Sequence, residues 1–199
     1  MTDLLDRREV RIRRMFDGIA PKYDLLNHLL SLNVDKSWRR RVTRMVPVTT
    51  GPLLDLCTGT GDLAFEYDRA LSGHVAIVGT DFSGKMLERA VAKSQHRGSH
   101  PRISFVQADA QHLPFSEDHF EVATVAFGLR NVTDPDRGLA EMVRVTRPGG
   151  RVAVLEFSRP RHWLFGRAFR AYFRYLLPVV GQLFSRSGDK AYAYLPASV

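Results

Sequence analysis

Cysteine is almost absent from this chain of 199 residues, since Cys57 is the only one. An internal disulfide is therefore excluded, and the composition fits a reducing compartment such as the cytoplasm. No apolar run approaches the ~20 residues that a bilayer-spanning helix needs, and the acidic first residues lack the apolar stretch of a secretory signal. Internal repeats and low-complexity tracts are also missing. These absences predict a single cytoplasmic globular domain over residues 1–199.

Charge is unevenly distributed along the chain. Residues 1–50 carry 11 Lys/Arg against 6 Asp/Glu, and residues 151–199 carry 8 against 2, whereas residues 51–150 carry 10 against 13. Basic ends around a slightly acidic centre indicate that the ends meet something anionic. Nucleic acid and an anionic membrane surface are the two candidates.

Short apolar runs alternate with amphipathic stretches through the centre of the chain. Five strands are expected, at Pro52–Cys57, Val75–Asp81, Ile103–Asp109, Phe120–Phe127 and Arg151–Phe157. Helices are expected at Asp62–Leu71, Ser83–Ser94 and Pro135–Thr146, with Ser83 as an N-cap. Strands that alternate with helices at this pitch predict an α/β fold, a mostly parallel sheet with helices on both faces.

Both ends of the chain are expected to be helical. Ile12, Met15, Phe16 and Ile19 have helical spacing, so residues 1–50 are interpreted as a helical lid on a core at 51–157. In residues 163–177 aromatic side chains occupy one face and three arginines the other. This face could line a pocket for an apolar ligand or pack in the core; nucleic acid is disfavoured because the aromatic and basic residues are segregated. Residues 158–199 are therefore expected to face substrate or membrane.

A Gly-rich turn follows the first expected strand, in the stretch Asp55-Leu-Cys-Thr-Gly-Thr-Gly-Asp62. A strand, a Gly-rich turn and a helix let a ligand approach exposed backbone N–H groups. Asp81 ends the second strand 20 residues after Gly61, where a carboxylate commonly accepts from ribose hydroxyls. This arrangement fits a dinucleotide equally well.

Carboxylates around the turn favour a cationic cofactor. Asp55 and Asp62 would repel a diphosphate but suit the ammonium and sulfonium groups of S-adenosylmethionine. Asp109, at the end of the third strand, could accept from the adenine amino group. The alternatives are that Asp62 caps a helix and that Asp55 braces the loop.

Several motifs resemble those of class I methyltransferases. The general signals are Asp55–Asp62, Gln107–Phe115 and Arg147–Gly150. Three further stretches resemble the ubiquinone/menaquinone biosynthesis C-methyltransferases, the UbiE/MenG type: Ala20–Asn27, Phe127–Thr133 and Leu155–Ser158. The resemblance runs from about residue 10 to the end, and the Phe127–Thr133 stretch is its most specific part.

This resemblance implies a Rossmann-like class I S-adenosylmethionine-dependent methyltransferase that methylates a ring carbon of a prenylated quinol, typically demethylmenaquinol. The cofactor site is then predicted to comprise Asp55, Thr58, Gly59, Thr60, Gly61, Asp81, Phe82, Asp109, Ala110 and Ala126. Ala126 departs from the serine that is frequent in relatives. The family normally continues for some tens of residues, so the usual C-terminal strands are expected to be lacking.

Three residues are predicted to serve the chemistry. Tyr23 and Asp24, on the expected lid, could position the ring or a water that acts as a base, and Arg130 could stabilise a developing phenolate. Lid packing and an ion pair are the alternatives for Tyr23 and Arg130. His28 is interpreted as structural. No metal site is expected, because His96 and His100 lack carboxylate neighbours.

The predicted partners are a prenylated quinol and an anionic membrane, touched peripherally at its cytoplasmic face. A homodimer is allowed, and no nucleic acid is expected. Two rival hypotheses stay open: another small-molecule or RNA methyltransferase, and a truncated cofactor-binding protein without activity. RNA base methylators often carry an Asn-Pro-Pro-Tyr element after the fourth strand, where this chain has Ala126–Asn131.

Overall fold

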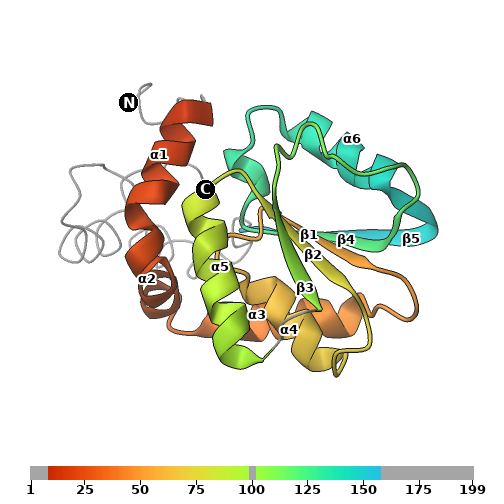
Figure 1. Ribbon diagram of the computed structural model, residues 1–199, viewed down its shortest axis with the longest axis horizontal. Coiled ribbons are helices and arrows are strands. Elements are labelled where there is room, and N and C mark those ends of the chain that lie inside the picture. The colour runs from red at the N-terminus through yellow and green to blue at the C-terminus, as the bar shows by residue number, and fades with distance from the viewer. Residues whose placement is uncertain (1–8, 99–101, 158–199) are drawn as a thin grey trace, which may run out of the picture.

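The computed structural model describes residues 9–98 and 102–157, and its centre is a five-stranded parallel sheet (Figure 1). The strands are β1 (Leu53–Leu56), β2 (Ile77–Asp81), β3 (Ile103–Gln107), β4 (Phe120–Ala126) and β5 (Thr146–Leu155). Their order is β3-β2-β1-β4-β5, and every neighbouring pair is parallel. The predicted α/β class with a parallel sheet is confirmed.

Helices cover both faces of the sheet. The helices that follow strands are α4 (Asp62–Ala70), α5 (Gly84–Arg97) and α6 (Pro135–Val145), and η3 (Leu129–Asn131) is a short 3-10 helix. In Figure 1, α6 lies on one side of the sheet, and α4 and α5 lie on the other. Their apolar faces meet the sheet as the amphipathic patterns predicted.

Alternation along the central strands divides the core into two layers. Leu54 and Ala123 face the layer that contains α6, whereas Leu53 and Val122 face the layer that contains α4. Successive side chains of a strand point to opposite faces, and both faces are covered, so β1 is buried along its whole length.

Helices also precede the sheet, in the segment that the sequence predicts to be a helical lid. They are α1 (Glu9–Ile19), η2 (Ala20–Lys22), α2 (Tyr23–Leu30) and α3 (Val34–Met45). Ile19 and Ala20 are buried against Met86 of α5, with Phe16 and Tyr23 packed beside them. Among the described residues, no helix combines the length and the apolar character that crossing a membrane would need.

Several element boundaries differ from the predicted ones. Cys57 has a φ of 51° and so leaves the extended conformation at the end of β1. β5 begins at Thr146, because the Arg147–Gly150 turn runs into the strand with a shifted register opposite Phe120 and Val122. Ser83 is confirmed as the N-cap of α5, its Oγ accepting the Met86 N–H at 3.2 Å. The predicted helix at 163–177 lies outside the described residues.

The strand order reverses between β1 and β4, which lie side by side although β2 and β3 separate them in the chain. Ligands of open parallel sheets bind in the crevice beyond the carboxyl ends of the strands at such a point. The Gly-rich turn follows β1, Asp81 ends β2, and Asp109 follows β3, so the topology brings them to one edge of the sheet.

Candidate active site

A cavity of about 790 Å³, including space open to solvent, lies at this carboxyl edge of the sheet. Strand ends and loops of the core form one side, and the lid helices form the other. It is lined by Ile12, Arg13, Phe16, Tyr23, Leu56, Cys57, Gly59, Asp81, Phe82, Ser83, Met86, Ala108, Asp109, Ala110, Gln111, Ala126, Phe127, Gly128, Asn131, Val132 and Thr133. A mostly apolar cleft with a few convergent polar groups is typical of a cofactor site.

Asp81 joins the end of β2 to the Gly-rich turn. Its Oδ2 accepts the Gly59 N–H at 2.8 Å, and its Oδ1 accepts the Ser83 N–H at 2.8 Å. Gly59 has a φ of 57°, which a residue without a side chain adopts without strain. Burial raises the pKa of Asp81 to about 6, against the two N–H bonds that lower it. The cavity therefore holds a carboxylate that is costly to keep ionised.

Asp109 is held in place by its own loop. Its Oδ1 accepts the Gln111 N–H at 2.9 Å, and His112 Nδ1 lies 3.3 Å from Oδ2. Burial acts to raise the pKa of Asp109, but the bonds from Gln111 and His112 outweigh it and hold the pKa below its usual value. Asp109 thus presents an ionised carboxylate that can accept a hydrogen bond in the cavity.

Six of the ten predicted cofactor residues line the cavity. They are Gly59, Asp81, Phe82, Asp109, Ala110 and Ala126. The other four, Asp55, Thr58, Thr60 and Gly61, do not line it and shape or anchor the turn instead. Gly61 has a φ of 89°, and a Cβ there would lie 2.7 Å from the Phe65 ring.

Asp55 lies beneath the turn and braces it. It accepts the Thr58 hydroxyl at 2.6 Å and the Thr124 hydroxyl at 3.0 Å. Burial raises the pKa of Asp55 to about 6, against these two bonds. The geometry is that of the loop-bracing alternative, since Asp55 connects the turn to β4 rather than to the cavity.

Asp24 and Asp62 belong to an ion-pair network between the lid and the core. Lys93 Nζ lies 2.9 Å from Asp24 Oδ2 and 2.7 Å from Asp62 Oδ1. The Thr60 hydroxyl donates to Asp24 Oδ1. Burial acts to raise the pKa of Asp62, but Lys93 and Arg39 outweigh it and keep the pKa below its usual value. Asp24 therefore connects α2 to the Gly-rich turn and does not line the cavity.

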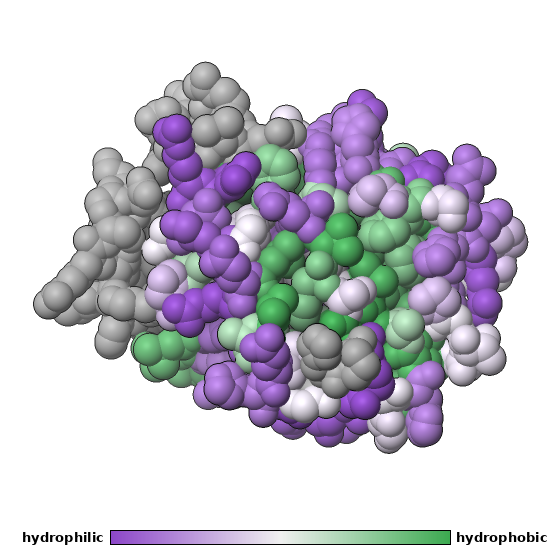
Figure 2. Space-filling view, in the orientation of Figure 1, coloured by the Kyte–Doolittle hydropathy of each residue, from purple (hydrophilic) through white to green (hydrophobic). Residues whose placement is uncertain are grey.

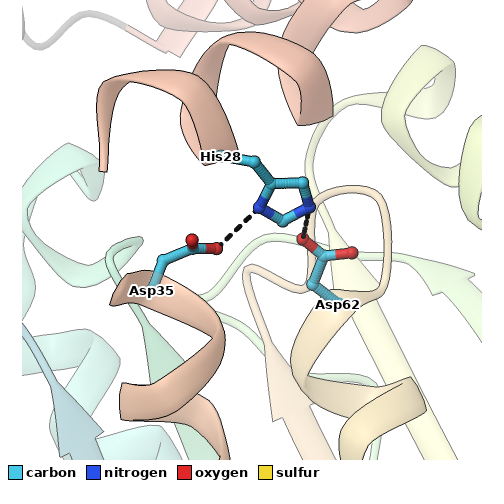
Figure 3. Close-up of side chains that lie close together, drawn as sticks. All are labelled: His28, Asp35 and Asp62. Carbon is cyan, nitrogen blue, oxygen red and sulfur yellow. Dashed lines mark hydrogen bonds and ion pairs between the residues drawn. The ribbon is translucent and has the colours of Figure 1, made fainter. Parts of the chain in front are cut away.

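His28 extends this network from α2, as Figure 3 shows. Its Nδ1 lies 2.9 Å from Asp35 Oδ2 of α3, and its Nε2 lies 3.7 Å from Asp62 Oδ2 of α4. Three side chains of this kind can in general hold a metal ion. Here Arg39 already donates to the same Asp35 oxygen, and Lys93 occupies Asp62. The geometry is that of a structural histidine between helices.

Tyr23 lines the cavity from the lid. Its ring packs edge-on against Phe16, with ring centroids 6.2 Å apart. Burial raises the pKa of Tyr23, although a hydrogen bond with Asn27 and the positive charges of Arg39 and Arg130 lower it in part. The phenol is therefore neutral at ordinary pH, a donor close to two guanidinium groups.

Arg130 and Glu156 form an ion pair beside the cavity. Arg130 Nη1 donates to Glu156 Oε2 at 2.6 Å, and the guanidinium lies 5.2 Å from the centre of the Phe157 ring. Neither residue lines the cavity, but their neighbours Asn131 and Phe127 do. Glu156 lies directly after β5, just as Asp81 lies at the end of β2. An acid at the carboxyl end of a strand is a signal that the sequence offered for Glu156 too, but it was not among the predicted site residues.

Three polar atoms in this region are buried without a hydrogen-bond partner among the described residues: Arg130 Nε, Asn131 Oδ1 and Glu156 Oε1. Buried polar groups are normally hydrogen-bonded, so these three atoms are candidates for contacts with a ligand. Aromatic rings stand next to them, since the Phe127 ring lies 4.8 Å from Phe157 and 5.9 Å from Trp38. Phe127 also has a φ of 59°, a strained conformation that is common at functional sites.

The cavity fits S-adenosylmethionine in the chemistry of its groups. Asp81 and Asp109 both present carboxylates at the cavity, which can accept hydrogen bonds from hydroxyl or amino groups. Phe82 and Met86 supply apolar surface for a flat heterocycle. A Cβ on Gly59 would make only an ordinary contact with the Tyr23 ring, at 3.7 Å, so the glycine is favoured by its φ of 57° rather than by a lack of space.

Comparisons with known proteins agree with this geometry. The model of the ubiE/COQ5 methyltransferase family matches residues 2–199. The "Ubiquinone/menaquinone biosynthesis C-methyltransferase UbiE" of Geotalea daltonii is 46% identical over 98% of this chain and 83% of its own length. The "Demethylmenaquinone methyltransferase" of Thermus thermophilus is 46% identical over 93% of this chain and 83% of its own.

Solved structures show the same fold. A Methanococcus maripaludis protein, provisionally assigned as an S-adenosyl-L-methionine-dependent methyltransferase, superposes with a TM-score of 0.66. The match covers 90% of this chain and 81% of that one, at 16% sequence identity. At that identity the likeness shows the class I methyltransferase fold alone.

Proposed function

The chain belongs to the ubiE/COQ5 methyltransferase family, and from this premise we propose its substrate and the roles of its residues. It is an S-adenosylmethionine-dependent methyltransferase of quinone biosynthesis, acting on a ring carbon. The substrate proposed here is a prenylated naphthoquinol, demethylmenaquinol, with menaquinol as the product. The name of the Thermus relative, "Demethylmenaquinone methyltransferase", supports the naphthoquinol. A prenylated benzoquinol is the alternative ring.

The cofactor is proposed to lie in the cavity along the ends of β1, β2 and β3. Asp81 would hold the ribose, Asp109 would accept from the adenine amino group, and Phe82 would lie against the heterocycle. The Gly59 backbone would allow close approach, and Thr60 would act through the turn. When bound, the cofactor supplies an electrophilic methyl group.

The three orphaned polar atoms carry the proposal for the substrate. A dihydroxy aromatic ring offers O–H donors for Asn131 Oδ1 and Glu156 Oε1, and a hydroxyl oxygen for Arg130 Nε. The rings of Phe127 and Phe157 supply a wall for a planar aromatic molecule. A fully oxidised quinone has only acceptors, so it would leave two of the three atoms unsatisfied. The reduced form therefore fits better.

Glu156 is proposed as the proton acceptor. Its Oε2 is held by Arg130, and its Oε1 is available to take the proton of a quinol hydroxyl, which makes the ring electron-rich. Arg130 then stabilises the phenolate oxygen. Methyl transfer turns the phenolate into a ring carbonyl. Loss of the ring-carbon proton to water then restores the aromatic ring, and Glu156 returns its proton to the oxygen, so one proton is released overall.

The lid residues are proposed to act on position rather than on protons. Tyr23, neutral and buried at the cavity, would hold the ring in place. Asp24 would anchor α2 to the Gly-rich turn through Thr60 and Lys93. Because the substrate carries a prenyl chain, we place the enzyme at the membrane surface; residues 158–199 are predicted to contribute there.

A direct assay tests this function. The full chain is titrated with S-adenosylmethionine by calorimetry and then assayed with a short-chain naphthoquinol, kept reduced, against the matching naphthoquinone. Methylation of the quinol alone is expected. Cofactor binding without turnover on naphthoquinol or benzoquinol would favour a non-catalytic binding protein.

A further inference from the structure

Leucines on the outer side of the lid are exposed to water. Leu25 and Leu29 are 61% and 43% exposed, and Leu32, in the turn after α2, is 76% exposed. Leu25 and Leu29 are one helical turn apart, so they share a face. In Figure 2, apolar surface is visible where α2 lies in Figure 1. We call Leu25, Leu29 and Leu32 the leucine ridge. An apolar patch of this kind is a mark of an interaction site.

The turn that carries Leu32 is strained. Leu32 has a φ of 51° and Asn33 a φ of 61°, so two consecutive residues are left-handed. Asparagine tolerates this conformation, but for leucine it costs on the order of 1 kcal/mol. A leucine here is thus unfavourable both for the backbone and for its contact with water. Its position indicates a contact that the free chain in water does not make.

The helix next to the ridge, α3, is strongly basic. Lys36, Arg40, Arg41 and Arg44 are all exposed, although Arg40 Nε also lies 3.9 Å from Glu66 Oε1 of α4. Asp35, the only acid of α3, is buried in the ion pairs with Arg39 and His28. The exposed surface of α3 is therefore cationic beside an apolar ridge. This charge favours an anionic partner and disfavours a second copy of the chain, because a two-fold contact would bring the same cations together.

We propose that the leucine ridge and the exposed cations of α3 form a docking surface for an anionic lipid bilayer. The leucines insert at the boundary between headgroups and acyl chains, and the cations bind lipid phosphates. Tyr23 lines the cavity from the other side of α2, so docking places the bilayer next to the lid of the site. The relevance of this surface to a prenylated substrate rests on the proposed function, but its binding to lipid does not.

Vesicle flotation of the full chain tests the surface. Wild-type protein is expected to float with vesicles of phosphatidylcholine and phosphatidylglycerol, and much less with phosphatidylcholine alone. The variant Leu25→Gln/Leu29→Gln/Leu32→Asn should bind at least about tenfold more weakly, since three apolar side chains are lost. Asparagine is chosen at 32 because it tolerates the left-handed turn. Val143→Gln on α6 is the matched control, because Val143 is 62% exposed on another helix.

The cations are tested in the same way. Arg40→Gln/Arg44→Gln should lower affinity for the anionic vesicles by roughly tenfold and weaken its salt dependence. Lys85→Gln/Arg89→Gln, an exposed pair with the same spacing on α5, is expected to bind like the wild type. Equal binding of both vesicle types, or wild-type binding by the ridge variant, would overturn the proposal.

Two further measurements separate the outcomes. Light scattering shows whether the ridge variant turns a dimer into a monomer, which would make the ridge a subunit contact and refute lipid docking. Methyl transfer to a naphthoquinol without a prenyl chain should be unchanged in the ridge variant. Absence of turnover by the wild type would refute the proposed function and leave vesicle binding to be judged on its own.

Discussion

The carboxylate of Asp81 accepts the backbone N–H of Gly59 at 2.8 Å, and this bond holds the Gly-rich turn against the end of β2. Burial raises the pKa of Asp81 from 3.8 to about 6. A ribose hydroxyl donates, so it needs the ionised carboxylate. The affinity for S-adenosylmethionine should therefore be full above about pH 7 and fall as the pH drops through 6, approaching tenfold per pH unit.

Calorimetry between pH 5 and 8 measures this dependence. Asp81→Asn should weaken binding by about 10²-fold and flatten the profile, whereas Asp136→Asn, exposed on α6, should match the wild type. For the free chain the sign is opposite. A raised pKa means that the contribution of Asp81 to stability is greatest at low pH and is lost as the pH rises through 6. A pH-independent affinity in the wild type would contradict the assignment.

The Arg130–Glu156 pair should act on turnover and not on cofactor binding. Glu156→Gln keeps the size of the side chain but cannot take a proton, and Arg130→Ala removes the charge that faces the phenolate. Each should lower kcat by about 10²-fold or more and leave cofactor affinity within about threefold. The reduction of kcat in the double variant should be much smaller than the product of the two single reductions, because the residues act as a unit.

A matched variant checks the role of Glu156 at saturating cofactor. Glu88→Gln, exposed on α5, should have the kcat of the wild type. A wild-type kcat in Glu156→Gln would assign the base elsewhere.

Asp24 should affect cofactor binding through the Gly-rich turn. Asp24→Asn weakens the contacts with Thr60 and Lys93, so KM for the cofactor should rise about three- to tenfold, the value of one hydrogen bond, with kcat within about threefold. A kcat that falls while KM stays constant would instead support a catalytic role for Asp24. Asp17→Asn, which loses a lid contact to Ser83, is the comparison variant.

The sheet and its ligand edge were predictable because they follow from local patterns. Short apolar runs predicted β1 to β5, and parallel strands bring their carboxyl ends together, which placed Asp81 and Asp109 at one site. The same logic applies to Glu156 after β5, although the predictions did not extend it there. The residues that lie at the ligand edge of a parallel sheet can thus be predicted from the sequence, because they follow the ends of the strands.

The directions of Asp55, Asp62 and Asp24 were not predictable in the same way. Proximity to the turn suggested that Asp55 and Asp62 face the cofactor, but Asp55 meets Thr124 of β4 and Asp62 meets Lys93 of α5. These partners are 69 and 31 residues away, and no local pattern encodes them. The sequence also could not show that Asp24 turns toward Thr60, because this depends on how α2 packs.

Glu121 should stabilise the entry to the sheet. Its carboxylate accepts the N–H groups of Thr49 and Thr50 at 2.9 and 2.8 Å and also that of Gly51. Although burial acts to raise the pKa of Glu121, these bonds lower it to about 2. A lowered pKa gives stability that is present above about 4.5 and is lost as the pH falls toward 2.

Denaturant unfolding of Glu121→Ala at pH 7 checks the size of this term. The loss of charge-assisted bonds should cost about 2 kcal/mol, and the variant should show a weaker pH dependence of stability between 5 and 2 than the wild type. Glu117→Ala, exposed in the preceding loop, serves as the control. Equal stability of the two variants would show that the loop at 49–51 satisfies its N–H groups without Glu121.

Gly128 and Cys57 should be coupled through the space between them. A Cβ on Gly128 would lie 2.3 Å from the Cys57 Cβ, so Gly128→Ala forces the loop after β4 away from the end of β1. The variant should lose about 1–3 kcal/mol of unfolding free energy and bind the cofactor more weakly, because both residues line the cavity.

Cys57→Gly removes the clashing atom and suits the φ of 51° at that position. The double variant should therefore recover most of the stability and affinity that Gly128→Ala loses, whereas two independent packing defects would add. Thermal unfolding and calorimetry of the two single variants and the double variant distinguish these results, and additive losses would refute the contact.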